Sequence, residues 1–238
     1  MLNKWFLTTA LTLAAFTVQA QEQPRRGGTI RFTAPYATSF TSNDSHVSPQ
    51  IQDEIYTYAL HRSLYRWNAA ENKPELELAT AVSKSADGLT WTFKLRDDAL
   101  FHNGRKMTAD DVIWTYTRLM DGSKSFPGAR YIRRIKGAVE VEKGQAKEIS
   151  GLKKIDDQTV EMTLVEKADP GFFLYYGQTS IYPAKEAQEP DFFNKPIGLG
   201  PFKFVEHVPG SRMVLDRWEK YFKPGKPYAD KVVISPMG

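Results

Sequence analysis

The sequence contains no cysteine. A chain without cysteine has no disulfide framework, no cysteine-ligated metal site, no thiol nucleophile and no cysteine for a lipid anchor. Only four histidines are present, and no pair of them has the spacing of a zinc motif. A Gly-x-Ser-x-Gly nucleophile motif is also missing. We therefore expect no cofactor and no metal, and the chain lacks the signatures of the common hydrolases.

Basic residues are in small excess over acidic residues. The chain has 32 basic and 28 acidic residues, a formal net charge of +4. The densest basic clusters are Arg133-Arg134-x-Lys136 and Lys153-Lys154. A nucleic-acid-binding protein usually gathers basic residues on one face. We interpret these clusters as solvated surface and expect no nucleic-acid partner.

One apolar run stands at the start of the chain. Lys4 precedes an apolar stretch over residues 5–18, and Val18-Gln19-Ala20 has the small-x-small pattern of a cleavage site. The run is shorter than the roughly 20 residues that span a membrane. We predict a cleaved signal peptide over residues 1–20, a mature chain from Gln21 and a periplasmic location. An uncleaved membrane anchor is the alternative.

Residues 83–120 show the clearest local pattern. Asp87-Gly88 predicts a tight turn, and a second turn follows at Asn103-Gly104. Between them, apolar and polar residues alternate with a period of two, which predicts a strand with one buried face. The apolar members of this strand are Leu89, Trp91, Phe93 and Leu95.

A helix is predicted after the second turn. Thr108 is the expected N-cap, and Asp110 and Asp111 fall in the first turn, where the helix dipole favours carboxylates. Adjacent helical residues point about 100° apart, so this pair does not converge on one substrate atom. We interpret both residues as capping groups, not as a catalytic pair.

Weaker patterns predict the remaining elements. Alternation or apolar runs indicate strands over residues 29–34, 160–164, 213–217 and 232–234. Ser48-Pro49 predicts the start of a helix that reaches about Leu64. Residues 123–134 predict a loop with a short helical turn, residues 135–141 predict a helix, and residues 172–176 a buried helical turn.

Four sequence blocks together resemble one family. Residues 87–96 read Asp-Gly-Leu-Thr-Trp-Thr-Phe-Lys-Leu-Arg, and Phe-His-Asn-Gly and Thr-Ala-Asp-Asp-Val follow at 101–104 and 108–112. Residues 198–204 read Gly-Leu-Gly-Pro-Phe-Lys-Phe, with Leu199 where the family usually has threonine. The chain resembles family 5 extracellular solute-binding proteins, the oligopeptide- and dipeptide-binding proteins of ABC importers.

The resemblance implies an α/β fold. The implied fold is a periplasmic binding protein-like lobe (type II, cluster C), in which helices flank a mixed sheet. Family members continue into a second lobe and then return to the first. We therefore expect residues 21–238 to hold the N-terminal part of lobe I of a truncated family 5 domain, with the second lobe absent.

The resemblance also implies reversible binding without catalysis. It predicts a monomer that binds a small peptide by lobe closure and delivers it to the permease and ATPase subunits of an ABC importer. Three alternatives stay open. The solute could be a nickel chelate, an oligosaccharide or an opine. The chain could be a cell-envelope enzyme, or an adhesin or chaperone-like interaction protein.

The ligand-lining residues are predicted from three segments. The polar and aromatic loop after the first strand is one, and in the resembled family it lines the cleft. The neighbourhood of residue 131, where relatives present an aromatic residue, is the second, and the glycine-rich block is the third. The residues are Tyr36, Thr38, Ser39, Phe40, Tyr131, Gly198 and Gly200. Tyr36 and Phe40 are expected to be partly exposed and to face the cleft.

Overall fold

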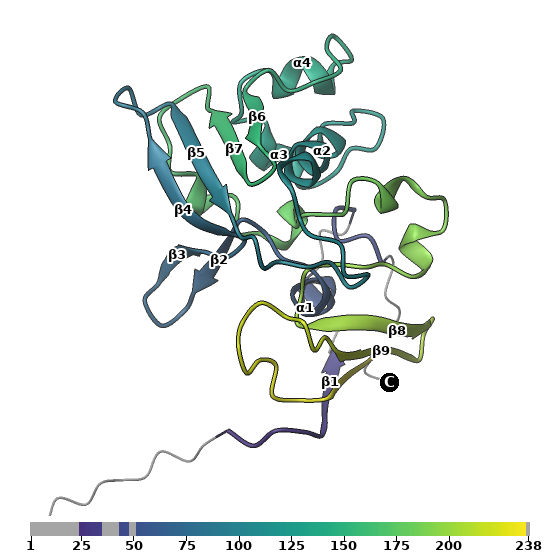
Figure 1. Ribbon diagram of the computed structural model, residues 1–238. Coiled ribbons are helices and arrows are strands. Elements are labelled where there is room, and N and C mark those ends of the chain that lie inside the picture. The colour runs from purple at the N-terminus through teal and green to yellow at the C-terminus, as the bar shows by residue number, and fades with distance from the viewer. Residues whose placement is uncertain (1–23, 35–42, 48–50, 237–238) are drawn as a thin grey trace, which may run out of the picture.

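The computed structural model of the protein describes residues 24–34, 43–47 and 51–236. Two groups of strands lie at opposite ends of this region, with helix α1 (Ile51–Leu60) between them (Figure 1). A small hairpin of β2 (Tyr65–Asn68) and β3 (Lys73–Leu76) projects from one side. In these residues, no helix has the length and apolar character needed to cross a bilayer.

The first group is an antiparallel sheet with the strand order β4-β5-β7-β6. Its central strand β5 alternates as predicted, because Trp91, Phe93 and Leu95 are buried and Lys94 is exposed. Gly88 has a φ of +77° in the turn before it, which only glycine adopts easily. The strands are β4 (Ala79–Lys84), β5 (Thr90–Leu95), β6 (Leu152–Asp156) and β7 (Thr159–Thr163).

Helix α2 (Ala109–Leu119) covers one face of this sheet. Thr108 is its N-cap, as predicted, and the Thr108 amide donates to Asp111 Oδ2 at 2.9 Å. The helix turns one apolar face to the core, since Val112, Tyr116 and Leu119 are buried. Two short helices follow, α3 (Ala129–Ile132) and α4 (Ala138–Glu142). The first is the expected helical turn, and the second begins three residues later than predicted.

The second group is a mixed sheet with the strand order β1-β10-β9-β8. β1 pairs in parallel with β10, placing Ile30 opposite Val232 and Phe32 opposite Ile234. The other pairs are antiparallel. The strands predicted at 29–34, 213–217 and 232–234 are therefore confirmed. The strands are β1 (Thr29–Ala34), β8 (Phe202–Val208), β9 (Arg212–Arg217) and β10 (Lys231–Pro236).

Helix α1 packs its apolar side on the mixed sheet. Tyr56 and Leu60 join a core with Phe202, Met213 and Leu215. The helix ends at Leu60, four residues before the predicted end, because the Gly200 amide donates to the Leu60 carbonyl at 2.8 Å and so caps it there. Its predicted start at Ser48-Pro49 lies outside the described residues.

Further features of the fold differ from the sequence-based expectations. β6 was not predicted: only Leu152 of its five residues is buried, so the strand carries no alternation. Phe173 and Leu174 are buried as predicted for residues 172–176, but Phe172 keeps 57% of its surface exposed. This segment lies among four short 3-10 turns, η1 (Pro170–Phe172), η2 (Gly177–Thr179), η3 (Glu186–Gln188) and η4 (Phe192–Asn194).

Candidate functional site

Three half-buried tyrosines stack on one another beside a pocket. Tyr131 lies on α3, and its ring is 4.4 Å from that of Tyr176, centroid to centroid, at an interplanar angle of 12°. Tyr176 in turn stacks on Tyr175 at 4.1 Å and 28°. Tyrosine combines a flat apolar ring with a polar hydroxyl, which suits contact with a mixed ligand such as a peptide. Of these three residues, only Tyr131 was among the predicted site residues.

Two local features bring these rings together. Gly128 lies at the N-cap of α3, and a Cβ there would fall 2.6 Å from the Gln178 carbonyl oxygen, so a side chain would push the two segments apart. On the other side, the Asp169 carboxylate accepts from the Gly171 amide at 2.8 Å and starts the η1 turn. The close approach at Gly128 thus allows Tyr176 to lie flat against Tyr131.

Arg130 holds the outermost ring. Its guanidinium carbon lies 4.6 Å from the centroid of the Tyr131 ring, and its Nη2 donates to the Tyr131 hydroxyl at 2.6 Å. Burial raises the pKa of Tyr131, and it raises the pKa of Tyr175 as well. Both hydroxyls are therefore neutral at physiological pH and are available as hydrogen-bonding groups.

The pocket next to the stack has a volume of about 470 Å³, within the usual range for small-molecule sites. Its walls combine aromatic rings with two arginines and one carboxylate. The lining residues are Arg130, Tyr131, Arg134, Ala168, Asp169, Phe172, Phe173 and Tyr176. We call it the tyrosine pocket.

The aromatic surface continues onto the β2–β3 hairpin. The Trp67 ring on β2 lies 5.2 Å from Tyr175 and 6.3 Å from Phe172, centroid to centroid. A pair of adjacent tyrosines was a visible signal in the sequence. What the sequence did not show is that Trp67, more than 100 residues earlier in the chain, would lie beside them.

The predicted site residues do not all come together. Tyr36, Thr38, Ser39 and Phe40 lie outside the described residues, so their placement and exposure stay predictions. Gly198 and Gly200 pack against the end of α1. A Cβ on Gly198 would fall 2.1 Å from the Leu60 carbonyl oxygen, and one on Gly200 2.4 Å from that of Ala59. The two glycines allow a close approach of backbone, and the partner is a helix end.

His102 holds residues 198–200, which we call the glycine loop, in place. Its Nδ1 accepts from the Gly198 amide at 3.1 Å, so Nε2 carries the proton and donates to the Gly200 carbonyl at 3.0 Å. Burial lowers the pKa of His102 to about 4, which keeps this neutral form. Leu199, which replaces the usual threonine, is buried in the main core, so its side chain packs where a hydroxyl would need a partner.

A buried polar cluster fixes residues 43–47, just after the predicted ligand loop. Arg118 on α2 donates to the Asp44 carboxylate and to His46 Nδ1, the latter at 2.6 Å. His46 Nε2 therefore carries the proton and donates to the Ser180 carbonyl at 2.8 Å. The Tyr182 hydroxyl lies 3.1 Å from Asp44 Oδ1. Burial lowers the pKa of His46 to about 4. Nothing in the sequence pattern marked this cluster.

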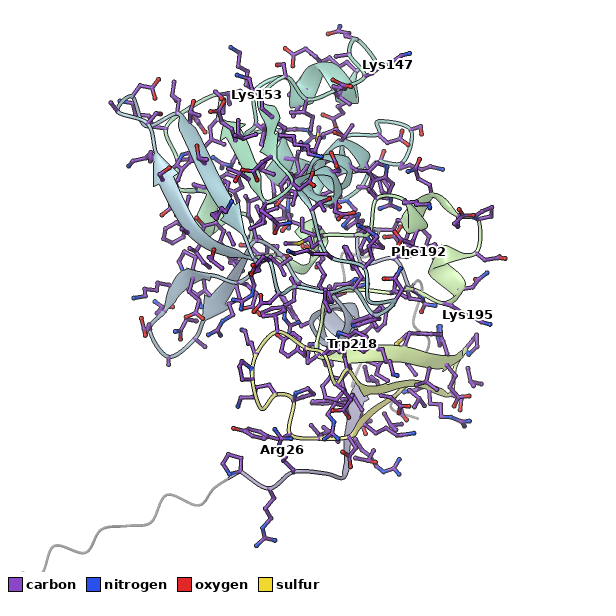
Figure 2. All side chains as sticks on the ribbon, in the orientation of Figure 1. Arg26, Lys147, Lys153, Phe192, Lys195 and Trp218 are labelled. Carbon is purple, nitrogen blue, oxygen red and sulfur yellow. The ribbon has the colours of Figure 1, made fainter. Side chains whose placement is uncertain are left out.

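The carboxylates of the described region serve structure. Asp111 is buried and pairs with Arg105, whereas the Asp110 carboxylate is exposed and accepts from Lys154 Nζ at 2.6 Å. The two side chains diverge, as predicted. Among the residues described, no group of three or more acidic or histidine side chains is arranged to hold a metal ion. Figure 2 shows Arg26, Lys147 and Lys195 on separate parts of the surface.

Comparison with known proteins identifies the family. Residues 73–238 match the model described as bacterial extracellular solute-binding proteins, family 5 Middle. The chain belongs to this family. The family 5 blocks noted in the sequence fall mainly on the β5 strand, the turn before α2, the start of α2 and the glycine loop. Homologues of this kind are binding proteins and not enzymes.

Individual relatives cover most of the chain. Heme-binding protein A of Haemophilus influenzae is 28% identical over 96% of the chain, and the oligopeptide-binding protein AppA of Bacillus subtilis is 29% identical over 88%. The structure of Listeria monocytogenes OppA bound to peptide covers 90% of the chain with a TM-score of 0.80 at 19% identity, which supports the predicted fold. The chain spans 46%, 37% and 43% of these three proteins.

Proposed function

We propose that this protein is the solute-binding component of an ABC importer and that it binds di- and oligopeptides. Family 5 membership supports this proposal, as does the similarity to an oligopeptide-binding protein. The observation that carries it is the stack of Tyr131 on Tyr176 beside the tyrosine pocket. The resemblance predicted a ligand-contacting aromatic residue at position 131.

The proposed mode of binding follows from the pocket walls. An extended peptide would be held through its backbone amides and carbonyls, while its side chains enter the tyrosine pocket. A pocket of about 470 Å³ leaves room for water around most side chains, so many sequences are accepted. Closure of a second lobe over the ligand would select the bound state that the transporter recognises.

We also propose a periplasmic location and a role without catalysis. The N-terminal n-region, apolar run and small-x-small site support export through a cleaved signal peptide. The pairing of Asp111 with Arg105, and of Asp110 with Lys154, supports binding over catalysis, because these carboxylates are engaged in ion pairs. The permease and ATPase subunits are the partners proposed by family membership.

A non-peptide solute is the second candidate. The similarity to a heme-binding protein, at 28% identity over 96% of the chain, favours it. So do the two arginines of the tyrosine pocket, which suit a ligand with carboxylates.

Protein-observed NMR titration of the chain with di-, tri- and tetra-alanine tests the proposal, since this method detects millimolar binding. We expect shift changes centred on residues 128–134 and 168–178. Tyr131→Ala should weaken binding by about tenfold, because the aromatic contact of roughly 1 kcal/mol and the bond to Arg130 are both lost. Tyr228→Ala is the matched control, since Tyr228 is a half-buried tyrosine beside the mixed sheet with Lys226 against its ring.

The results separate the two candidates. Equal loss of binding in Tyr131→Ala and Tyr228→Ala would contradict a ligand role for the stack. Shift changes with a porphyrin dicarboxylate, combined with silence from all three peptides, would replace the peptide with a non-peptide solute.

A further inference from the structure

A second pocket lies between the end of α1, the β2 strand and the loop that follows β9. Its volume is about 340 Å³, and its lining residues differ from those of the tyrosine pocket. Three of them are cations and three are aromatic, with a single carboxylate among them. The lining residues are Tyr58, Arg62, Ser63, Tyr65, Arg66, Trp67, Glu77 and Lys223. We call it the Glu77 pocket.

Glu77 is almost completely buried, with 2% of its surface exposed, and its hydrogen-bonding capacity is used up. Oε1 accepts from Arg62 Nε at 3.0 Å and from the Tyr221 hydroxyl at 3.3 Å. Oε2 pairs with Arg66 Nε at 3.3 Å and with Lys223 Nζ. An ionised carboxylate offers about four acceptor positions, so this one has none left.

The three cations keep donors that Glu77 cannot take. Arg62 Nη1 donates to the carbonyls of Tyr58 and His61, and Arg66 Nη2 pairs with Glu75. Glu77 pairs with one nitrogen of each of the three cations, which together carry more N–H donors than one carboxylate can accept. Even with Glu75 counted, three positive charges face two negative ones.

This surplus charge is partly removed from water. Arg62 has 16% of its side chain exposed and Lys223 has 34%. Burial lowers the pKa of the Lys223 ammonium, and the charges of Arg66 and Arg62 lower it further, although Glu77 acts in the opposite direction. An additional anion at this place would offset the mutual repulsion of the cations.

The rest of the wall is aromatic. Tyr58 and Trp67 are partly exposed at the pocket, and Tyr65 is buried behind them. Flat rings favour a flat apolar group on the ligand, whereas the excess of guanidinium and ammonium groups over carboxylates favours a carboxylate, which can accept from two donors at once. Glu77, being saturated and central, excludes a cationic ligand.

We propose that the Glu77 pocket binds a small aromatic carboxylic acid, with the carboxylate at Arg62, Arg66 and Lys223 and the ring between Tyr58 and Trp67. The ligand would bridge α1, the β2–β3 hairpin and the loop at Lys223, and so link the hairpin to the half of the molecule that holds the mixed sheet. None of its lining residues also lines the tyrosine pocket.

Phenylacetate tests the proposal, with phenylacetamide as its neutral counterpart and acetate as its charged counterpart without a ring. Each compound is titrated into the chain and followed by calorimetry and protein-observed NMR. We expect phenylacetate to bind about tenfold more tightly than either counterpart, since a charged hydrogen-bond acceptor and a buried ring each contribute on the order of 1 kcal/mol. Equal binding of phenylacetate and phenylacetamide would overturn the proposal, as would no binding at all.

Two variants locate the site. Lys223→Met should weaken phenylacetate binding by about fivefold or more, because it removes one charged donor. Lys220→Met is the control, because Lys220 is an exposed lysine three residues earlier, and it should bind as the parent does. If Lys223→Met fails to fold, Arg66→Gln provides the same test at a side chain with 44% of its surface exposed. Unchanged affinity in whichever variant folds would refute the assignment.

A site-specific measurement completes the test. With lysines reductively dimethylated using ¹³C, the Lys223 signal can be titrated with pH. We expect its pKa to rise on addition of phenylacetate and to stay unchanged with phenylacetamide. The same rise with both compounds, or with neither, would contradict carboxylate binding at Lys223.

Discussion

The antiparallel sheet and the mixed sheet are built from different kinds of sequence information. The four strands of the antiparallel sheet lie within residues 79–163, and its central strand β5 has a fully buried Phe93. In the mixed sheet, β1 pairs with β10 near the other end of the chain, and Phe32 on β1 stays 41% exposed. Pairings within about 85 residues therefore build the first sheet, whereas the second depends on a distant partner.

The cores differ in the same way. The larger core among the described residues joins the antiparallel sheet to α2 and to the segment around Phe173 and Leu174. The smaller one holds α1 on the mixed sheet. Ile30 and Phe32 share a face with Val232 and Ile234, yet they are half-exposed at the sheet edge. We expect the stability of the described region to come mainly from the antiparallel half.

The largest expected effect tests this difference directly. Phe93→Ala should lower the free energy of unfolding by about 3–5 kcal/mol, because it leaves a cavity in a closed core. Phe32→Ala should cost about 1 kcal/mol, because much of that ring is already in contact with solvent. Urea unfolding of both variants is the measurement. Similar losses in the two variants would show that the edge strand β1 contributes as much to stability as the central strand β5.

A smaller effect on the free energy of unfolding is expected at acid pH. It arises from buried histidines, among them His102 between the antiparallel sheet and the mixed sheet. His102 holds the glycine loop, its ring lies 5.6 Å from Trp218, and its pKa in the folded state is about 4. The pKa of His46 is also about 4, and burial holds the pKa of His61 well below 6.5. The unfolded chain, with histidine pKa values near 6.5, then binds protons that the folded chain cannot.

Stability should therefore be complete above pH 6.5 and fall as the pH is lowered towards 4, by about 3 kcal/mol for a shift such as that of His102. Urea midpoints between pH 7.5 and 4 measure this loss. His102→Gln should be less stable than the parent at pH 7.5 and should show a shallower decline. A parent-like decline in this variant would indicate that His102 does not contribute to the acid response.

The smallest expected effect compares two glycines. Gly198→Ala should cost about 1–3 kcal/mol, because the new Cβ would overlap the Leu60 carbonyl and force the glycine loop away from α1. Gly144→Ala should cost about 1 kcal/mol, since its φ of +69° is unfavourable for alanine but the space around it is open. Thermal unfolding of both variants checks the order, and a reversed order would refute the packing role of Gly198.

The sequence predicted the elements that carry their own pattern. The alternation of Trp91, Phe93 and Leu95 and the N-cap at Thr108 are both confirmed. These predictions succeed because each depends on residues within one turn or one strand. β6 was not predicted, because an exposed edge strand needs no alternation of apolar and polar residues. Its hydrogen bonds to β7 hold it in the strand conformation.

The candidate site could be predicted only in part. Tyr131 was found through the resemblance, and its role in ligand binding stays a prediction. Its partners Tyr175 and Tyr176 come from a segment with no regular period, so only the fold places them against α3. The Glu77 pocket was missed for a similar reason: Lys223 lies 146 residues after Glu77, and Arg62, Glu77 and Lys223 share no motif.

The pairing of β1 with β10 has a consequence for the timing of folding. The Gly28 amide donates to the Asp230 carboxylate, a partner 202 residues away, so this contact can form only after nearly the whole described chain has been synthesised. All strands of the antiparallel sheet are complete by residue 163. Local contacts form faster than distant ones. A nascent chain can therefore pair the strands of the antiparallel sheet while β1 still lacks its partner, and an unpaired edge strand is exposed to mispairing or to capture by a chaperone.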